Sequence, residues 1–303
     1  MQVTITNFVN IQPFASDTAL CLGFFDGVHR GHQALIEEAK KSRLRVAVLT
    51  FDRSPKAALG SSLLTTVEDR LAVFESLGVS ETLLVVFDDN VKSMSAEQFI
   101  DALNKLKVKK VFCGPDFRFG HKAKGDAALL KYGLGRDFVT TIVPEVLEDE
   151  AKISSSRIIK HLQYGNIKAV TRMLGRPYVI KGTIAKGKGN GKKLGYPTAN
   201  LALTASYVLP LNGVYAVSVL LEGISYYGMA SVGYHPTIDP VEKPLVEVHI
   251  LDFSKKIYGK HISVSFLQFM RPEQTFKTIE ELISRMRIDE KEIRELKSKL
   301  YNA

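Results

Sequence analysis

Short apolar runs alternate with helical patterns over the first half of the chain. An amphipathic helical pattern, HQALIEEAKKS, follows the first run. The runs lie between Ala19 and about Val143 and read ALCLGFF, RVAVLTF, ETLLVVF, KKVFCG and FVTTIVP. Apolar runs of this length separated by helices are typical of βαβ units. The pattern therefore predicts an α/β domain built on a parallel sheet.

The second half of the chain has a different pattern of apolar and polar residues. Residues 154–174 predict a helical segment that Gly165 and Asn166 interrupt and that Gly175 and Pro177 end. Beyond Pro177 come Gly-punctuated strands, which predict a small antiparallel barrel. These strands read YVIKGTI, GVYAVSVLL, YYGMASVG, LVEVHILDF and HISVSFLQF.

Two apolar stripes follow Pro272, the first from Ile279 to Met286 and the second from Ile293 to Leu300. They predict C-terminal helices that close the barrel. We expect a first domain over 1–158, a helical linker over 159–176, and a barrel domain with C-terminal helices over 177–303.

Composition adds little beyond size and compartment. With 303 residues, 45% of them hydrophobic, the chain can bury the cores of two domains. Lysine and arginine (41) exceed aspartate and glutamate (32) along the whole chain, which suits polyanionic small molecules such as ATP at least as well as nucleic acid. Cys21 and Cys113 have no CxxC partner and favour a reducing compartment. With no signal peptide or long apolar run, we expect a cytoplasmic chain without a membrane segment.

The sharpest local feature is the stretch GFFDGVHRGH, residues 23–32, between an apolar strand and a helical pattern. A helix N-terminus binds phosphate through its free N–H groups and partial positive charge. His29 and His32 are three residues apart, so both can face that phosphate and stabilise charge on it. The alternative is a strand-to-helix turn with two solvated histidines.

These residues resemble the GxFDGxHxGH signature of the nucleotidyltransferase superfamily, in the form found in prokaryotic bifunctional riboflavin kinase/FAD synthetases. The resemblance implies a Rossmann-like nucleotidyltransferase domain that adenylylates FMN without a covalent intermediate, with the α-phosphate of ATP between the two histidines. The ATP-binding residues it implies in this stretch are Gly23, Phe25, Asp26, Gly27, His29 and His32.

Two further stretches match the same family. GPDFRFG, residues 114–120, resembles its second motif, and Asp116 could bind a ribose hydroxyl or Mg²⁺ or simply stabilise a turn. The segment from Ile153 to Ile158 resembles the third motif, which implies that Ser155 and Arg157 bind the triphosphate; a serine run before a helix is otherwise usually a cap. Arg53-Ser54, in place of a common Pro-His, and Ile159, in place of a basic residue, depart from the family pattern.

A second candidate site opens the barrel region. Glycines interleaved with lysines over 182–195 suit a loop around phosphates, and the spacing excludes a Walker A loop. Thr198 and Asn200 lie two apart in the extended segment YPTANL and can converge on a Mg²⁺ ion. On the alternating strand LVEVHIL, Glu247 points away from the valines and could accept or orient an alcohol proton, although an exposed strand glutamate is often only solvated.

GTIAKGKGNGKKLGYPTANL, NGVY and VEVHILDF together resemble the riboflavin kinase domain. That similarity implies a six-stranded barrel with Thr198 and Asn200 at Mg²⁺-ATP, Glu247 as the catalytic base, and Arg271 on a loop near the flavin. The ATP- and flavin-binding residues that it implies are Gly182, Gly187, Gly191, Lys192, Gly195, Pro197, Thr198, Asn200, Tyr215 and Arg271.

The two resemblances together imply a two-site transferase. ATP phosphorylates riboflavin to FMN with release of ADP, and ATP adenylylates FMN to FAD with release of pyrophosphate. Mg²⁺ is the expected ion, and the chain is expected to be a monomer or to self-associate weakly. The rivals are a chain that keeps one activity and a nucleic-acid-binding or flavin-sensing regulator supported by the net charge of +9.

Overall fold

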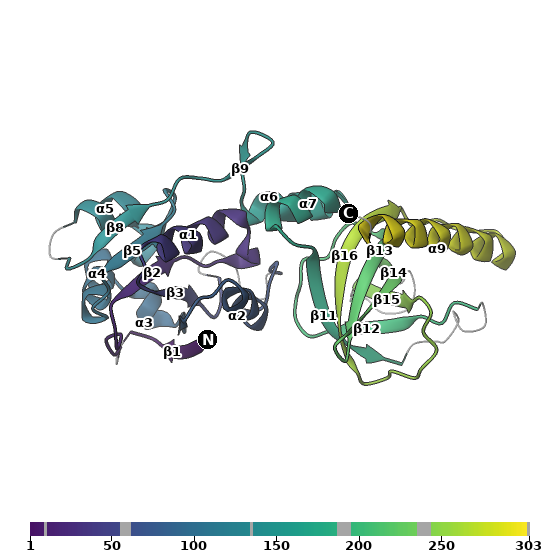
Figure 1. The fold of residues 1–303 in the computed structure, drawn as a ribbon, viewed down its shortest axis with the longest axis horizontal. Coiled ribbons are helices and arrows are strands. Elements are labelled where there is room, and N and C mark those ends of the chain that lie inside the picture. The colour runs from purple at the N-terminus through teal and green to yellow at the C-terminus, as the bar shows by residue number, and fades with distance from the viewer. Residues whose placement is uncertain (9–10, 55–61, 134–135, 187–194, 235–243, 302–303) are drawn as a thin grey trace. The chain divides into compact units, whose positions relative to one another are not determined.

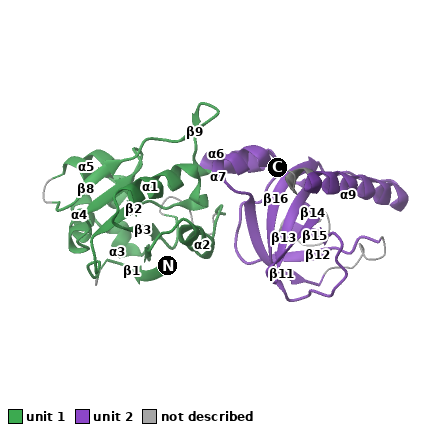
Figure 2. Cartoon of the chain, viewed as in Figure 1, with its two compact units in different colours: residues 1–155 green, residues 156–303 purple. Residues whose placement is uncertain are grey.

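The computed structural model describes residues 1–8, 11–54, 62–133, 136–186, 195–234 and 244–301 (Figure 1). The chain divides into two compact units, Met1–Ser155 and Ser156–Ala303 (Figure 2). Each unit has its own sheet and its own hydrophobic cores.

Unit 1 is built on a six-stranded sheet in the order β1-β4-β3-β2-β5-β8, and all of its strand pairs are parallel. The strands are β1 (Gln2–Thr6), β2 (Thr18–Leu22), β3 (Arg45–Phe51), β4 (Glu81–Val85), β5 (Lys110–Cys113) and β8 (Val139–Ile142). The five apolar runs expected as strands are β2, β3, β4, β5 and β8, so the parallel α/β fold is confirmed.

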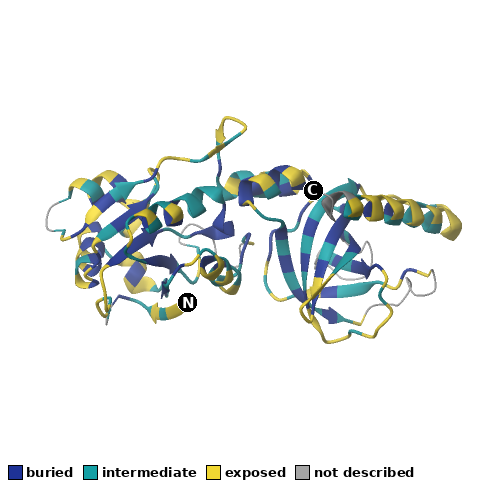
Figure 3. Cartoon of the chain, in the orientation of Figure 1, coloured by how far each residue is buried: buried dark blue, intermediate teal, exposed yellow. Residues whose placement is uncertain are grey.

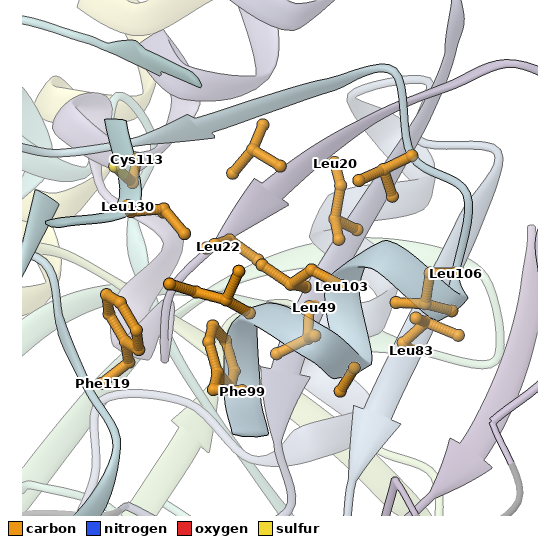
Figure 4. Packing of buried hydrophobic residues seen from close by; sticks show 14 of the residues in the cluster. Leu20, Leu22, Leu49, Leu83, Phe99, Leu103, Leu106, Cys113, Phe119 and Leu130 are labelled. Atoms are coloured by element: carbon orange, nitrogen blue, oxygen red, sulfur yellow. The ribbon is translucent and has the colours of Figure 1, made fainter. Parts of the chain in front are cut away.

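Helices cover both faces of this sheet because its central strands are apolar on both sides (Figure 3). Leu20 and Leu22 of β2 face one core with Phe99 and Leu103 of α4 (Figure 4). Ala19 and Cys21 alternate to the other face and pack with α1 and α2. The helices are α1 (Arg30–Lys41), α2 (Val67–Ser76), α3 (Asp89–Ser93), α4 (Ala96–Lys105) and α5 (Ala127–Tyr132).

The loops of unit 1 contain short 3₁₀ turns and short strand pairs. A 3₁₀ turn spans Asp26–Val28 and another spans His121–Ala123. Two short antiparallel pairs complete the unit: β6 (Arg118–Phe119) with β7 (Gly125–Asp126), and β9 (Leu147–Glu148) with β10 (Ala151–Lys152).

The strand order reverses between β2 and β5. From β2 the chain builds β3 and β4 to one side, and it later adds β5 and β8 to the other. In open α/β sheets, ligands bind outside the carboxyl ends of the strands at such a reversal. The loops that begin at Gly23 and at Gly114 follow β2 and β5, so two sequence motifs meet the sheet at its expected ligand-binding edge.

Two helices follow unit 1. They are α6 (Ser155–Gln163) and α7 (Ile167–Leu174), and Asn166 caps α7 by accepting from the backbone N–H of Ala169. The expected break at Gly165-Asn166 is therefore present. α7 contacts β11 and β16 of the barrel, so it belongs to the compact body of unit 2.

Unit 2 contains a closed antiparallel barrel in the order β11-β12-β15-β14-β13-β16, which confirms the six-stranded expectation. Alternate residues of β11 from Tyr178 to Ile184 are buried, as a barrel wall requires. The strands are β11 (Tyr178–Ala185), β12 (Ala199–Leu203), β13 (Gly213–Leu221), β14 (Ile224–Tyr234), β15 (Pro244–Ile250) and β16 (His261–Arg271).

One helix, α9 (Ile279–Tyr301), replaces the separate C-terminal helices expected from two apolar stripes. Ile283 and Met286 from the first stripe and Ile293 and Leu296 from the second pack into one cluster with the barrel. Their spacing fits a single helical face, and no Gly or Pro interrupts it. Within the described residues, no helix of the chain has the length and apolarity to cross a membrane.

Candidate active sites

The loop after β2 carries two stacked histidines. The chain leaves β2, makes the 3₁₀ turn and enters α1, whose N-cap is His29. The backbone N–H of His32 donates to Nδ1 of His29 over 3.3 Å. The two imidazole rings stack with 3.6 Å between their centroids. The structure thus places both imidazoles at the start of a helix, where phosphate-binding N–H groups are available.

His32 is held as a neutral imidazole. Burial, followed by the charges of His29, Arg70 and Lys152, lowers the pKa of His32 well below its usual value. The ring of Phe25 lies 5.0 Å from the ring of His32, and Nδ1 of His32 is buried without a hydrogen-bond partner among the described residues. A neutral imidazole has one N–H donor and one acceptor nitrogen. The pair can therefore offer a donor to a bound phosphate.

We predict that this histidine makes the chain less stable in weak acid. A lowered folded-state pKa means that the unfolded chain binds more protons, so stability is present above about pH 6.5 and falls by up to about 1.4 kcal/mol per pH unit below it. Urea unfolding at about pH 7 and about pH 5.5, for wild type and His32→Gln, measures the effect. The wild type should lose more stability than the variant. An equal loss in both proteins would refute the assignment.

Asp26 ties the loop after β2 to Leu64 and Thr65 through hydrogen bonds. Its Oδ1 accepts from the backbone N–H and the hydroxyl of Thr65, both over 3.1 Å, and its Oδ2 accepts from the N–H of Leu64 over 3.2 Å. The Ser155 hydroxyl donates to the carbonyl of Asp26 over 2.9 Å, and the Gly27 N–H donates to Thr65 Oγ1 over 2.8 Å. Burial raises the pKa of Asp26, and the hydrogen bonds from Leu64 and Thr65 and the charge of Arg70 oppose that rise. Both carboxylate oxygens are used inside the protein, and an ATP contact of Asp26 or Ser155 stays a prediction.

Local packing and backbone conformation explain why the loop after β2 has glycine at three positions. A Cβ on Gly31 would lie 3.1 Å from the ring of His29, and a Cβ on Gly23 would lie 3.0 Å from the ring of Phe25. Gly27 has φ 77°, in the left-handed region. Glycine at these positions lets the two rings and the turn occupy the same small space.

The loop after β5 brings Asp116 to Lys152. Nζ of Lys152 lies 2.8 Å from Oδ2 of Asp116 and 2.7 Å from Oε1 of Glu145. These hydrogen bonds raise the pKa of Lys152 against the opposing effect of desolvation. The charge of Lys152 also lowers the pKa of His32, so its ion pair with Asp116 links the second motif electrostatically to the histidine pair. Arg157 lies in the first turn of α6, beyond the unit boundary, and its triphosphate contact stays a prediction.

In the barrel, strand pairing brings Asn200 and Glu247 together. Asn200 of β12 lies directly opposite Glu247 of β15, and Ser231 of β14 lies opposite it on the other side. Val246 and Val248 are buried, and Glu247 is only half-buried. Directly opposed residues of antiparallel strands share a face. The expected carboxylate and amide therefore point to one side of the barrel wall, with the Ser231 hydroxyl beside them.

His249 fixes the segment that leads into β12. Its Nδ1 lies 2.9 Å from the carbonyl oxygen of Pro197, and its ring packs edge-on against Tyr196 at 5.2 Å. Pro197 immediately precedes Thr198, so this contact ties the start of the YPTANL segment to the strand of Glu247. The Thr198 hydroxyl and the Asn200 amide oxygen lie on this segment, and both atom types can coordinate a metal ion.

Arg271 and Tyr215 lie inside the protein. Arg271 was expected on a loop, but it is the last residue of β16, and its Nη2 pairs with Asp289 of α9 over 2.9 Å. Asp289 is fully buried and also pairs with Arg285, so closure of the barrel by α9 explains the difference. Tyr215 is fully buried, and its hydroxyl donates to the carbonyl of Leu211. The flavin or nucleotide contacts of both residues stay predictions.

The glycine loop is only partly described. Gly187, Gly191 and Lys192 lie outside the described residues. A Cβ on Gly182 would lie 2.5 Å from the Ala202 carbonyl oxygen, so close strand approach already requires glycine there. Gly195 has φ 81° and open space around it, which suits a turn at the end of the loop.

Comparison with known proteins matches both halves of the chain. Residues 11–157 match the FAD synthetase family and residues 174–297 match the riboflavin kinase family. The bifunctional riboflavin kinase/FMN adenylyltransferase of Listeria monocytogenes is 38% identical over 93% of both chains, and that of Bacillus subtilis is 36% identical over 91% of both. The chain belongs to this bifunctional family. It is a transferase with an N-terminal FAD synthetase region and a C-terminal riboflavin kinase region, as the motifs predicted.

A solved structure from Streptococcus pneumoniae, titled a macrolide-efflux protein, is also similar to this member of the family. Its TM-score is 0.89 at 33% identity, and the match covers 97% of this chain and 99% of that one. The likeness therefore extends over both units and supports the same two-part fold.

Four residues at the two candidate sites were given no role from the sequence. Thr65 had a weak signal, because the next residue, Thr66, opens a capping box with Asp69 that marks the start of α2. Arg70 and Ser231 had none, since each lies in an ordinary helical or strand pattern. The alternation of its strand puts His249 on the face of Glu247 but gives it no role. Their roles depend on which distant backbone segment they meet.

Proposed function

We propose that His29 and His32 bind the α-phosphate of ATP during adenylylation of FMN in unit 1. The observation that carries this is the stacked pair at the N-terminus of α1, with His29 buried and His32 half-buried, beside the strand reversal of the sheet. An FMN phosphate oxygen attacks the α-phosphorus and pyrophosphate leaves. The attacking phosphate is already ionised, so the two imidazoles need only orient the α-phosphate and stabilise charge on its oxygens.

In unit 2 we propose Glu247 as the base that accepts the proton of the ribityl 5′-hydroxyl as its oxygen attacks the γ-phosphorus of ATP and ADP leaves. Its placement opposite Asn200 on the barrel wall supports this role. The hydroxyl of Thr198 and the amide oxygen of Asn200 are hard oxygen donors that fit Mg²⁺. When bound, Mg²⁺ would neutralise phosphate charge.

The domain limits proposed are 1–158, 159–176 and 177–303. The family matches over 11–157 and 174–297 support these limits, and the division between Ser155 and Ser156 supports the end of the first domain. Cys21 and Cys113 are free and buried, which supports a reducing, cytoplasmic location. We also propose small-molecule substrates instead of nucleic acid, and a monomeric or weakly associating chain.

A product assay tests the proposal. Purified protein with riboflavin, ATP and Mg²⁺ should form FMN and then FAD, and excess chelator should stop both. Formation of neither product, or full turnover with the divalent cation removed, would contradict the proposal.

A further inference from the structure

A buried arginine, Arg70, is hydrogen-bonded to the loop of residues 23–32 that follows β2 and carries the histidine pair, called the histidine loop below. Arg70 of α2 is 1% exposed. Its Nη1 donates to the Phe24 carbonyl over 2.7 Å and to Thr50 Oγ1 over 2.8 Å. Its Nη2 donates to the Phe51 carbonyl over 2.9 Å, and its Nε reaches the Thr66 carbonyl at 3.4 Å. One guanidinium thus joins the loop after β2, the end of β3 and the start of α2.

The charge of Arg70 is stabilised by neutral hydrogen-bond acceptors. No ion pair among the described residues includes it, and its hydrogen bonds go to carbonyl and hydroxyl oxygens. Burial lowers the pKa of Arg70 to about 10, opposed first by the charge of Asp26, so the group stays protonated at neutral pH. Burying a charge without a directly paired countercharge is costly, and an apolar side chain would fill a helix position more cheaply.

The loop that Arg70 holds is strained. Phe25 has φ 60° and Val28 has φ 39°, both in the region that side chains other than glycine rarely adopt. Such conformations persist only where the surroundings over-determine them, and they concentrate at functional sites. The Phe24 carbonyl, directly before Phe25, accepts from both Arg70 and the Thr50 hydroxyl, the latter over 2.8 Å.

The ring of Phe25 connects the strained backbone to the histidines, because it packs against His32. The Phe25 ring lies 5.0 Å from the ring of His32 and is fully buried. If the Phe24 carbonyl turned, the Phe25 ring would shift, and the stacked imidazoles would lose the surface against which they lie.

We propose that Arg70 is a positioning residue for adenylyl transfer, which holds the Phe24 carbonyl so that Phe25 keeps the stacked His29 and His32 in the orientation for the α-phosphate. This inference rests on the proposed role of the two histidines. Arg70 acts through the loop and touches no substrate.

Two substitutions separate geometry from charge. Arg70→Lys keeps the charge, but one ammonium cannot reach acceptors on three segments, and Arg70→Met removes both. Because small misplacement of reacting groups is expensive, we expect kcat for FAD formation to fall about tenfold in Arg70→Lys and about a hundredfold in Arg70→Met. The KM for ATP should stay within about threefold of wild type, since the binding groups remain.

A double-substitution cycle tests whether Arg70 acts through the Phe24 carbonyl. Thr50→Val removes the second donor to that carbonyl with little change of volume, and we expect kcat to fall about threefold. If both donors act on one group, the loss in the Thr50→Val/Arg70→Lys protein should differ from the product of the two single losses. Independent, multiplying losses would overturn the proposal.

The riboflavin kinase activity of the same chain is the internal control, and Leu103→Ala is the matched stability control. Leu103 lies in the core between α4 and the sheet (Figure 4), away from the loop, so it should lower thermal stability while kcat for FAD formation is retained. If the Arg70 variants keep the wild-type kcat, or lose it only as Leu103→Ala does, Arg70 is merely structural and the inference is wrong. If Arg70→Met does not fold, Arg70→Lys and Thr50→Val decide. If His29→Ala retains FAD formation, it is the proposed histidine site that fails.

Discussion

Replacing His29 with alanine should abolish FAD formation while FMN still forms from riboflavin. The substitution removes one ring of the stacked pair and the Nδ1 acceptor for the His32 N–H, so both the proposed donor to the α-phosphate and the orientation of its partner are lost. Loss of one preorganised donor costs about 10²–10³ in kcat. Chromatography of riboflavin, FMN and FAD over time measures both reactions in one sample.

The matched control is His121→Ala. His121 is exposed and its ring contacts the Lys92 carbonyl, so its loss should leave both products at wild-type rates. An intermediate effect in His29→Asn, which keeps a side-chain donor, would support hydrogen bonding to phosphate. If His29→Ala accumulates FAD at the wild-type rate, the histidine pair is not the adenylyl-transfer site.

Replacing Glu247 with glutamine should have the reverse effect. The amide keeps the size of the side chain and its position opposite Asn200, but it cannot accept the hydroxyl proton. Loss of a general base costs about 10²–10⁴ in rate, so riboflavin should persist. FAD should still form from supplied FMN, because the histidine loop belongs to the other unit.

Glu222→Gln provides the comparison for this change. Glu222 is exposed, and its hydrogen bond and ion pair with Lys260 lower its pKa. The variant loses a surface ion pair of little energetic value, and both activities should remain. Equal phosphorylation of riboflavin by wild type and Glu247→Gln would show that another group accepts the proton or that none is needed.

The two proposed sites would place phosphate in different ways. In unit 1 a helix N-terminus and a strained loop at a strand reversal present N–H groups and imidazoles. In unit 2 opposed strands present oxygen donors and a carboxylate from a closed barrel wall. The first arrangement suits stabilisation of charge on an α-phosphate, and the second suits binding of a metal and proton acceptance.

Much of the fold could be predicted because it is periodic. Fully apolar strands such as β2 and β3 indicate a sheet covered on both faces, and alternation along β11 and β15 indicates a barrel wall. β1 escaped prediction because it is a short edge strand with exposed Val3 and Ile5, and only pairing with β4 defines it. The division of α9 into two helices was wrong because two stripes on one helical face look like separate segments when no packing partner is known.

The sequence by itself determined the strand–turn–helix around His29 and His32 and the residue types at each motif, since these depend on neighbours within a few positions. Only the tertiary structure decided that Asn200 faces Glu247, that Arg70 lies under Phe24, and that Arg271 pairs with Asp289. Each of these contacts joins segments at least 18 residues apart. Strand register and helix packing bring them together, and neither leaves a periodic trace at the single residue involved.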